Sequence, residues 1–142
     1  MGGEILIARP VEEVFDYVAD QRNELIYNPR MLQSVKITDG PIGVGTRFRA
    51  TARSGRRPVE MLIEVTEFHR PSRFGSRTTM SSVDVDGGVT FEPLAGETRM
   101  SWSWTVRPRG PLRLLGPLIG HLGRRQERAI WTGLKSHLEG SR

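Results

Sequence analysis

The chain opens with an apolar pattern that is typical of a helix. Within ARPVEEVFDYVADQ, residues 8–21, four apolar side chains recur at i, i+3, i+4 and i+7 and form one stripe: Val11, Val14, Phe15 and Val18. Pro10 suits the first helical position. Asp20 can end this helix and cap a short second helix through NELIY, which Asn28-Pro29 then stops.

The middle of the chain alternates between apolar and polar residues, which is typical of half-buried strands. Such signals recur along 35–37, 47–52, 59–65, 73–80, 88–93 and 98–106. The last two segments read as a hairpin across LAGE. In 98–106 apolar and polar residues alternate. The apolar positions are Met100, Trp102, Trp104 and Val106, and the polar positions are Arg99, Ser101, Ser103 and Thr105. Strict alternation predicts antiparallel strands with one buried and one solvated face.

Helical spacing returns from about Leu114 to Leu138. An apolar stripe there includes Leu115, Leu118, Ile119, Leu122 and Ile130, and continues through Leu134 and Leu138. A helix of about 25 residues spans roughly 37 Å, enough to cross a sheet. Helices at both ends of a run of strands predict an α+β fold. We therefore expect this helix on the concave face of an antiparallel sheet, burying Leu122 and Ile130.

Composition limits the class of protein. The 142 residues suit one domain, and the lack of cysteine excludes disulfides and thiolate zinc sites. No apolar run approaches the roughly 20 residues of a membrane span, and no signal peptide is visible at the start. The sequence therefore predicts a soluble, cytoplasmic protein.

The positive charge is concentrated near the end of the chain. The net charge is +5, but residues 107–142 hold seven arginines and Lys135 against Glu127 and Glu139, a net of +6. We expect at most weak, salt-sensitive peripheral contact of this segment with an anionic membrane. No specific nucleic-acid partner is expected, because aromatic residues do not interleave with these arginines.

A glycine-rich stretch, DGPIGVGTRF at 39–48, raises the question of a phosphate loop. Such a loop needs a helix N-terminus behind its glycines. Here TRFRAT follows, which alternates like a strand, and no Gly-Lys-Ser/Thr occurs. Gly40, Gly43 and Gly45 are therefore interpreted as turn residues between two strands.

Several motifs together resemble a known family. They are IARPVEEVFDYVADQRNE, GPIGVGTRF, VTEFHRPSRF, GVTFEPLAGETRMSW and LKSHLE, in this order and spread over nearly the whole chain. The sequence resembles the START-like or Bet v 1-like superfamily, in its polyketide cyclase/dehydrase (SRPBCC) branch. One departure is Tyr27, where the family often has a tryptophan.

The resemblance implies a helix-grip fold in one START-like domain over 1–142. In that fold a curved antiparallel sheet of about seven strands wraps around a long C-terminal helix, with two short helices after the first strand. Members bind apolar molecules such as lipids, sterols, quinones and polyketides in a cavity between sheet and helix, and a minority are cyclases or dehydratases. Fold alone does not choose among these functions.

The sequence offers little sign of catalysis. His69, His121 and His137 lack metal-site spacing, and no G-x-S-x-G motif occurs, so we predict no metal and no cofactor. Asp84 and Asp86 share a strand face but read better as a solvated rim.

Two further groups of polar residues are candidates for the cavity. Glu67 and His69 share the parity of Val65 and, without a bulge, would reach the mouth of the concave face, although a solvated strand end is favoured. Gln126 lies within the apolar stripe of the helix. Its amide group is either hydrogen-bonded by water or a backbone group, or it binds the polar end of a ligand.

The predicted function is binding of an apolar small molecule without turnover. The expected cavity residues are Tyr27, Phe48, Met61, Ile63, Phe74, Met80, Phe91, Met100, Trp102, Trp104, Leu122, Gln126 and Ile130. The ligand would lie along Trp102 and Trp104, whereas Trp131 is placed on another helix face. The alternative is a cyclase or dehydratase that uses Glu67, His69, Tyr27 or Arg77 as acid or base.

Overall fold

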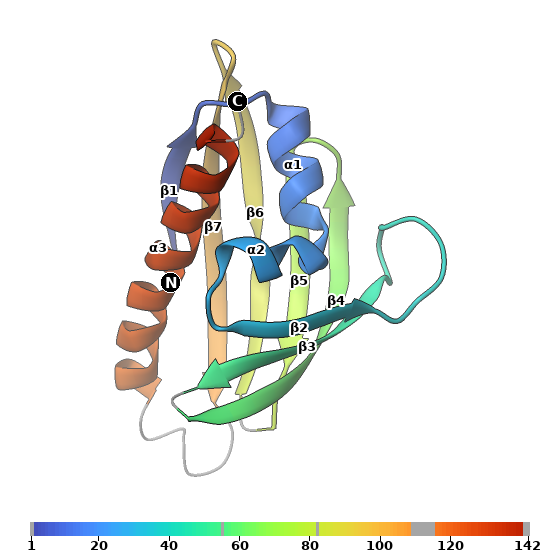
Figure 1. Ribbon diagram of the computed structural model, residues 1–142, viewed down its shortest axis with the longest axis vertical. Coiled ribbons are helices and arrows are strands. Elements are labelled where there is room, and N and C mark those ends of the chain that lie inside the picture. Colours follow the sequence, from blue (N-terminus) through green and yellow to red (C-terminus); the bar gives the residue numbers. More distant parts are fainter. Residues whose placement is uncertain (1, 55, 82, 109–115, 141–142) are drawn as a thin grey trace.

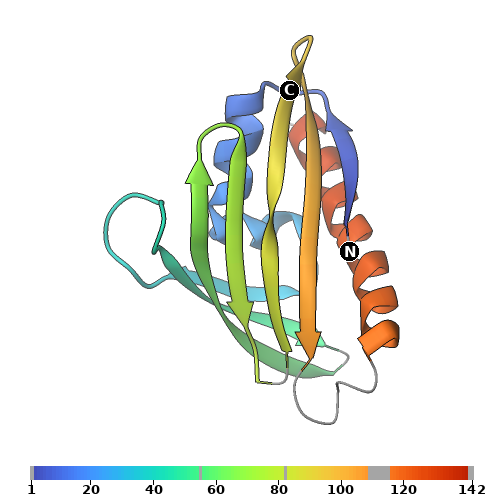
Figure 2. The same cartoon turned by 180° about the vertical axis from the view of Figure 1, so that it is seen from behind.

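The computed structural model of the protein describes residues 2–54, 56–81, 83–108 and 116–140, with the backbone alone described for residue 54 and residues 116–126. Within these ranges seven strands form one antiparallel sheet in the order β1-β7-β6-β5-β4-β3-β2 (Figures 1 and 2). Their bounds are β1 Gly2–Ile7, β2 Met31–Lys36, β3 Arg47–Ser54, β4 Arg57–His69, β5 Arg73–Thr79, β6 Val83–Leu94 and β7 Glu97–Pro108.

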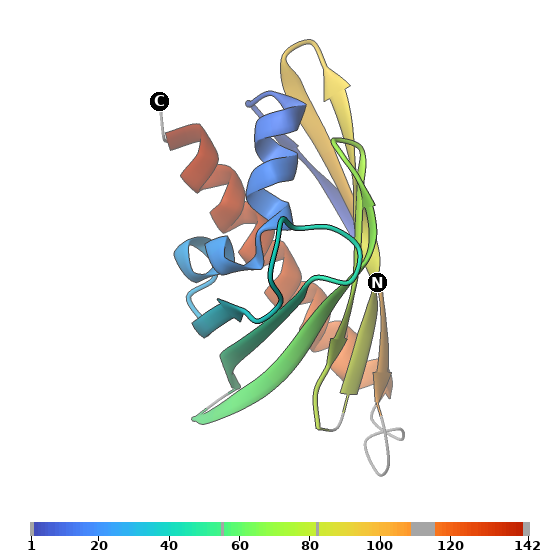
Figure 3. The ribbon, with the colours of Figure 1, turned by 90° about the vertical axis from the view of Figure 1, so that its right-hand side faces the viewer.

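The helices all lie on one face of this sheet. They are α1 Val11–Ala19, the 3-10 turn η1 Gln21–Asn23, α2 Glu24–Tyr27 and α3 Gly116–Gly140. Figure 3 shows the sheet nearly edge-on, with strands β2 to β4 bending toward the helices. The predicted α+β helix-grip fold is confirmed, including the two short helical segments after the first strand.

The first helix forms as its sequence pattern predicts. All four stripe residues are buried: Val11, Val14, Phe15 and Val18. The Phe15 ring meets Phe68 and Phe91 edge-on, with ring centroids 5.2 Å apart in both pairs. Asp20 ends the helix, and its Oδ1 accepts a hydrogen bond from the backbone N–H of Arg22. It therefore caps the 3-10 turn that precedes α2 rather than α2 itself.

The hairpin of β6 and β7 is also confirmed, and β6 begins five residues earlier than the pattern indicated. Ala95 and Gly96 form its turn, with φ of 51° and 85°. Trp102 is buried and Trp104 half-buried on the inner face, as the alternation of 98–106 predicts. The glycine-rich stretch is a turn region between β2 and β3, also as predicted, with Gly40 and Gly45 at positive φ.

Polar contacts hold the second half of α3 to the start of the chain. Lys135 Nζ donates to the carbonyl oxygen of Leu6 at 2.6 Å, and the backbone N–H of Ala8 donates to Glu139 Oε2 at 2.8 Å. Gly133 faces the carbonyl oxygen of Tyr27, which would lie only 2.8 Å from an added Cβ. The missing side chain therefore lets α3 approach α2 closely.

The apolar stripe of α3 is rotated from the predicted one. Leu134 and Leu138 are buried as expected, and Ile130 is half-buried. Trp131, which the sequence predicts on another helix face, is 7% exposed and faces the interior. The prediction for Leu122 falls on a side chain outside the described ones.

Candidate functional site

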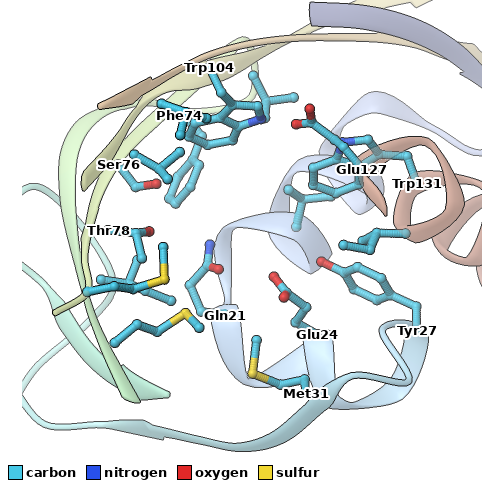
Figure 4. A pocket seen from close by; sticks show the side chains of 18 of the residues that line it. Gln21, Glu24, Tyr27, Met31, Phe74, Ser76, Thr78, Trp104, Glu127 and Trp131 are labelled. Atoms are coloured by element: carbon cyan, nitrogen blue, oxygen red, sulfur yellow. The ribbon is translucent and has the colours of Figure 1, made fainter. Parts of the chain in front are cut away.

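A cavity of about 490 Å³ lies between the inner face of the sheet and the helices, partly open to solvent. Figure 4 looks into it. Its described lining combines apolar and aromatic side chains with a few polar ones: Val18, Gln21, Glu24, Tyr27, Met31, Met61, Ile63, Phe74, Ser76, Thr78, Met80, Val83, Val85, Val89, Trp104, Val106, Glu127, Ile130 and Trp131. This size and composition are typical of small-molecule sites.

Seven of the residues predicted for a cavity line it: Tyr27, Met61, Ile63, Phe74, Met80, Trp104 and Ile130. Four others belong to the solid core instead: Phe48, Phe91, Met100 and Trp102. For Phe91 and Met100 the reason is α1, which packs on β6 and β7 and fills the space in front of them. The side chains of Leu122 and Gln126 lie outside the described ones.

The acid and base candidates lie mostly away from this cavity. A bulge between Val65 and Glu67 reverses the parity of β4, so that Phe68 packs on the core. Glu67 instead forms an ion pair with Arg73, and His69 and Arg77 are exposed. The expectation that Glu67 and His69 reach the mouth of the cavity required a β4 without a bulge, so it is wrong. Of the four acid and base candidates, Tyr27 alone is among the described residues that line the cavity.

Asp84 and Asp86 do not join the cavity lining either. They lie on β6, where Asp86 meets Arg107 at 3.6 Å. His137 lies beside Tyr17, with ring centroids 5.4 Å apart. Within the described ranges no cluster of three His, Cys, Asp or Glu side chains could hold a metal ion.

The sequence interpretation missed five polar residues of the lining: Gln21, Glu24, Ser76, Thr78 and Glu127. Ser76 and Thr78 share the strand parity of Phe74, so β5 carries them onto the same inner face. Gln21 and Glu24 come from η1 and α2, which face the sheet across the cavity (Figure 4). Only Glu127 had a helical signal, because it precedes Ile130, Trp131 and Leu134 by three, four and seven residues.

Glu24 is the carboxylate on the α2 side. Asn28 Nδ2 donates to its Oε2 at 2.8 Å. Burial raises the pKa of Glu24, and the bond from Asn28 opposes part of that rise. Burial, together with the nearby Glu24, also raises the pKa of Tyr27 well above its usual value. Tyr27 is therefore a neutral hydroxyl at ordinary pH.

Glu127 is the carboxylate on the α3 side. Burial raises its pKa to about 7, and the nearby indole N–H of Trp131 opposes part of the rise. Glu127 Oε2 and Trp131 Nε1 are both buried, and neither has a hydrogen-bond partner of good geometry among the described residues. The cavity thus contains a carboxyl group that changes charge near neutral pH.

This titration predicts a pH-dependent loss of stability. A folded-state pKa above the unfolded one means that the folded protein binds more protons, so the free energy of unfolding falls as pH rises from about 4.5 through 7. After discounting for solvent screening of this half-buried group, we expect a loss of about 1–2 kcal/mol. Glu127→Gln should remove it, as measured by urea unfolding at pH 5 and pH 8.5. Thr132→Ala, an exposed change on the same helix, should keep the wild-type difference; an identical pH dependence in Glu127→Gln would contradict the assignment.

Four aromatic rings form a row, and its two middle rings, Tyr27 and Trp131, line the cavity. Tyr17 and Tyr27 have centroids 6.0 Å apart, Tyr27 and Trp131 6.2 Å, and Trp131 and Trp102 5.8 Å. The row joins α1, α2, α3 and β7. Tyr27 and Trp131 therefore present flat, rigid surface to the cavity.

Comparisons with known proteins agree with this geometry. The model of the family described as "Polyketide cyclase / dehydrase and lipid transport" matches residues 3–139. No curated protein matches the sequence. None of the helices in the described ranges has the length and hydropathy of a membrane span.

Solved structures share the fold at low sequence identity. A protein of Thermus thermophilus is 21% identical with a TM-score of 0.84, over 99% of this chain and 97% of its own. A START superfamily protein from Mycobacterium smegmatis is 13% identical with a TM-score of 0.85, over the same shares. The Zhui aromatase/cyclase from a Streptomyces species is 12% identical with a TM-score of 0.78, over 98% of this chain and 92% of its own.

Proposed function

The chain belongs to the polyketide cyclase / dehydrase and lipid transport family, and from that premise we propose that it binds an apolar small molecule in the cavity between sheet and helices. Lipid-like, quinone-like and polyketide-like molecules are the classes that such a lining suits. The observation that carries the proposal is the cavity of about 490 Å³, with its aromatic, methionine and aliphatic walls. Met31, Met61 and Met80 add adaptable surface to the rigid rings.

A second candidate is turnover of the bound molecule by cyclase or dehydratase chemistry. Glu127 favours it, because a carboxyl group with a pKa of about 7 inside an apolar cavity suits general acid–base catalysis. The structure of an aromatase/cyclase shares the fold. We rank simple binding first, because the described lining contains no pair of nucleophile and base in hydrogen-bond contact.

Tryptophan fluorescence provides the test of binding. Titration with fatty acids, sterols, quinones and aromatic polyketides should change the emission saturably for at least one class. Trp104 and Trp131 line the cavity, so Trp104→Phe and Trp131→Phe should each reduce the change. Trp102→Phe should keep most of it, because Trp102 lies in the core behind Trp131.

Mass spectrometry of the bound molecule separates the two candidates. Incubation followed by extraction should return a bound ligand unchanged if the protein only binds, and a cyclised or dehydrated product if it is an enzyme. Absence of saturable binding by every class, both in titration and in native mass spectrometry of the purified protein, would contradict the proposed function.

A further inference from the structure

One polar part of the cavity lining pairs a donor with an acceptor on successive turns of α3. Glu127 and Trp131 are separated by four residues, so their side chains project from the same helix face. Figure 4 shows both directed toward the space enclosed by the sheet, α2 and α3. Trp131 is 7% exposed, and among the described residues neither its buried Nε1 nor the buried Oε2 of Glu127 has a hydrogen-bond partner of good geometry. Unsatisfied buried polar atoms are costly, and a ligand that pairs with them gains that energy.

The charge of the lining is one-sided. Its described residues include the carboxyl groups of Glu24 and Glu127 but no arginine, lysine or histidine. Asn28 already donates to Glu24, so that carboxyl group has a partner from the protein. The described lining therefore offers an anionic ligand no arginine, lysine or histidine, and any ionised carboxylate in it would repel that ligand.

Building on the proposed function, we propose that the ligand presents a neutral hydroxyl group, phenolic or alcoholic, to Glu127 and Trp131. The hydroxyl oxygen accepts from Trp131 Nε1–H, and its hydrogen is donated to the Glu127 carboxylate. Glu127 and Trp131 are therefore specificity-determining residues that select a hydroxylated apolar molecule from the classes that the cavity can hold.

While Glu127 is ionised, hydrogen-bonding capacity prevents ammonium, carboxylate, ether and ketone groups from pairing with both residues. An ammonium group donates to Glu127 but has no lone pair for Trp131, whereas a carboxylate accepts from Trp131 but cannot donate to Glu127. An ether oxygen or a ketone also only accepts. A hydroxyl group does both from one atom, and it carries no charge into the apolar cavity.

A matched set of probes with one ring system tests this selectivity. The probes are phenanthren-9-ol, 9-methoxyphenanthrene, phenanthrene-9-carboxylate and 9-phenanthrylmethylammonium, titrated at pH 8 so that Glu127 is largely ionised. We expect the hydroxyl probe to bind at least about tenfold more tightly than the ether and the ammonium, and the carboxylate to bind weakest. The readout is the dissociation constant from tryptophan emission, confirmed by calorimetry.

Three variants assign the selectivity to the two residues. Trp131→Phe keeps a ring but removes the N–H, and should reduce the preference for hydroxyl over ether several-fold. Glu127→Gln removes the charge, and should improve binding of the carboxylate probe about tenfold or more. Arg128→Gln changes a charge on the exposed side of the same helical turn and should leave all four constants unchanged.

The outcomes separate this inference from the proposed function. Equal binding of all four probes would overturn the hydroxyl assignment while leaving ligand binding intact, and tightest binding of the ammonium would overturn it in favour of a cationic ligand. Failure of every probe to bind would overturn the hydroxyl assignment, whereas the proposed function would be overturned only if the fatty acids, sterols, quinones and aromatic polyketides also failed to bind. Circular dichroism of each variant shows whether it is folded, and the ranking in the wild-type protein tests the assignment without any variant.

Discussion

Replacing Phe15 by alanine is expected to lower the free energy of unfolding by about 3–5 kcal/mol. Phe15 is 0% exposed, and its ring meets Phe68 from β4 and Phe91 from β6 edge-on at 5.2 Å. The substitution removes buried apolar area and two aromatic contacts, and it leaves a void that the β-sheet on one side is too rigid to fill. Phe15 belongs to the apolar stripe through which α1 packs on the inner face of the sheet, so the loss of stability should be large.

Urea unfolding followed by circular dichroism measures this loss. Val44→Ala is a matched control, because Val44 is 70% exposed and its truncation should change stability by less than about 0.5 kcal/mol. Phe15 does not line the cavity, so a variant that is still folded should bind the same ligands with little change in affinity. A loss below about 1 kcal/mol would show that α1 is not packed on the sheet as described.

Residues with a local pattern were predicted well from the sequence. The parity of Trp102 and Trp104 on β7 follows from the arginine, serine and threonine residues that alternate with the apolar ones along the strand, because burial of those polar groups would cost more than burial of the indoles. The stripe of α1 has the same kind of cause. Side chains repeat every two residues along the strand and every 3.6 residues along the helix. Residues close in sequence therefore determine which face of each element is buried.

The bulge in β4 shows why parity fails over longer strands. One extra residue between Val65 and Glu67 reverses the inward face, and Phe68 takes the inward position that would have fallen to Glu67. No glycine or proline marks this point in VTEF. The bulge depends on pairing with β5, which is a partner that the local sequence does not specify.

Glu127 and Trp131 were missed as cavity residues because the predicted helix stripe was centred on the wrong residues. Taking Leu122 and Ile130 as its centre pointed to Gln126 and turned Trp131 away. In the structure Trp131, Leu134 and Leu138 face the interior, and this rotation carries Glu127 with them. A tryptophan at helical spacing from two leucines was the available signal, and its polar N–H is consistent with a position at the edge of a cavity.

The division of the inner face into solid core and cavity had no local signal at all. Met100 and Trp104 lie on the same face of the same strand, yet Met100 is core and Trp104 is cavity wall. The difference arises from which helix covers each part of the sheet. Such coverage depends on contacts between residues far apart in the chain, so the strand pattern alone cannot reveal it.

Replacing Gly87 by alanine is expected to cost about 2–4 kcal/mol, and it tests the wall of the cavity directly. Gly87 lies in β6 opposite Trp104 of β7, with a φ of 148° that side chains rarely adopt. An added Cβ would lie 2.1 Å from the carbonyl oxygen of Ser103 and 2.9 Å from the Cα of Trp104. Both atoms belong to the backbone of β7, so no side-chain rotation can relieve the contact, and the two strands must separate.

The substitution Gly87→Ala should weaken ligand binding as well as lower the stability. Separation of β6 from β7 would displace Trp104, which lines the cavity, so the folded fraction of Gly87→Ala should also bind the fluorescent ligands more weakly. Gly43→Ala is the matched control, because an added Cβ there meets nothing within 4 Å and the residue is not at positive φ. Urea unfolding and titration of both variants give the comparison. If Gly87→Ala matched Gly43→Ala in both measurements, β6 and β7 could not approach as closely at this point as the structure shows, and the position of Trp104 in the cavity wall would lose its support.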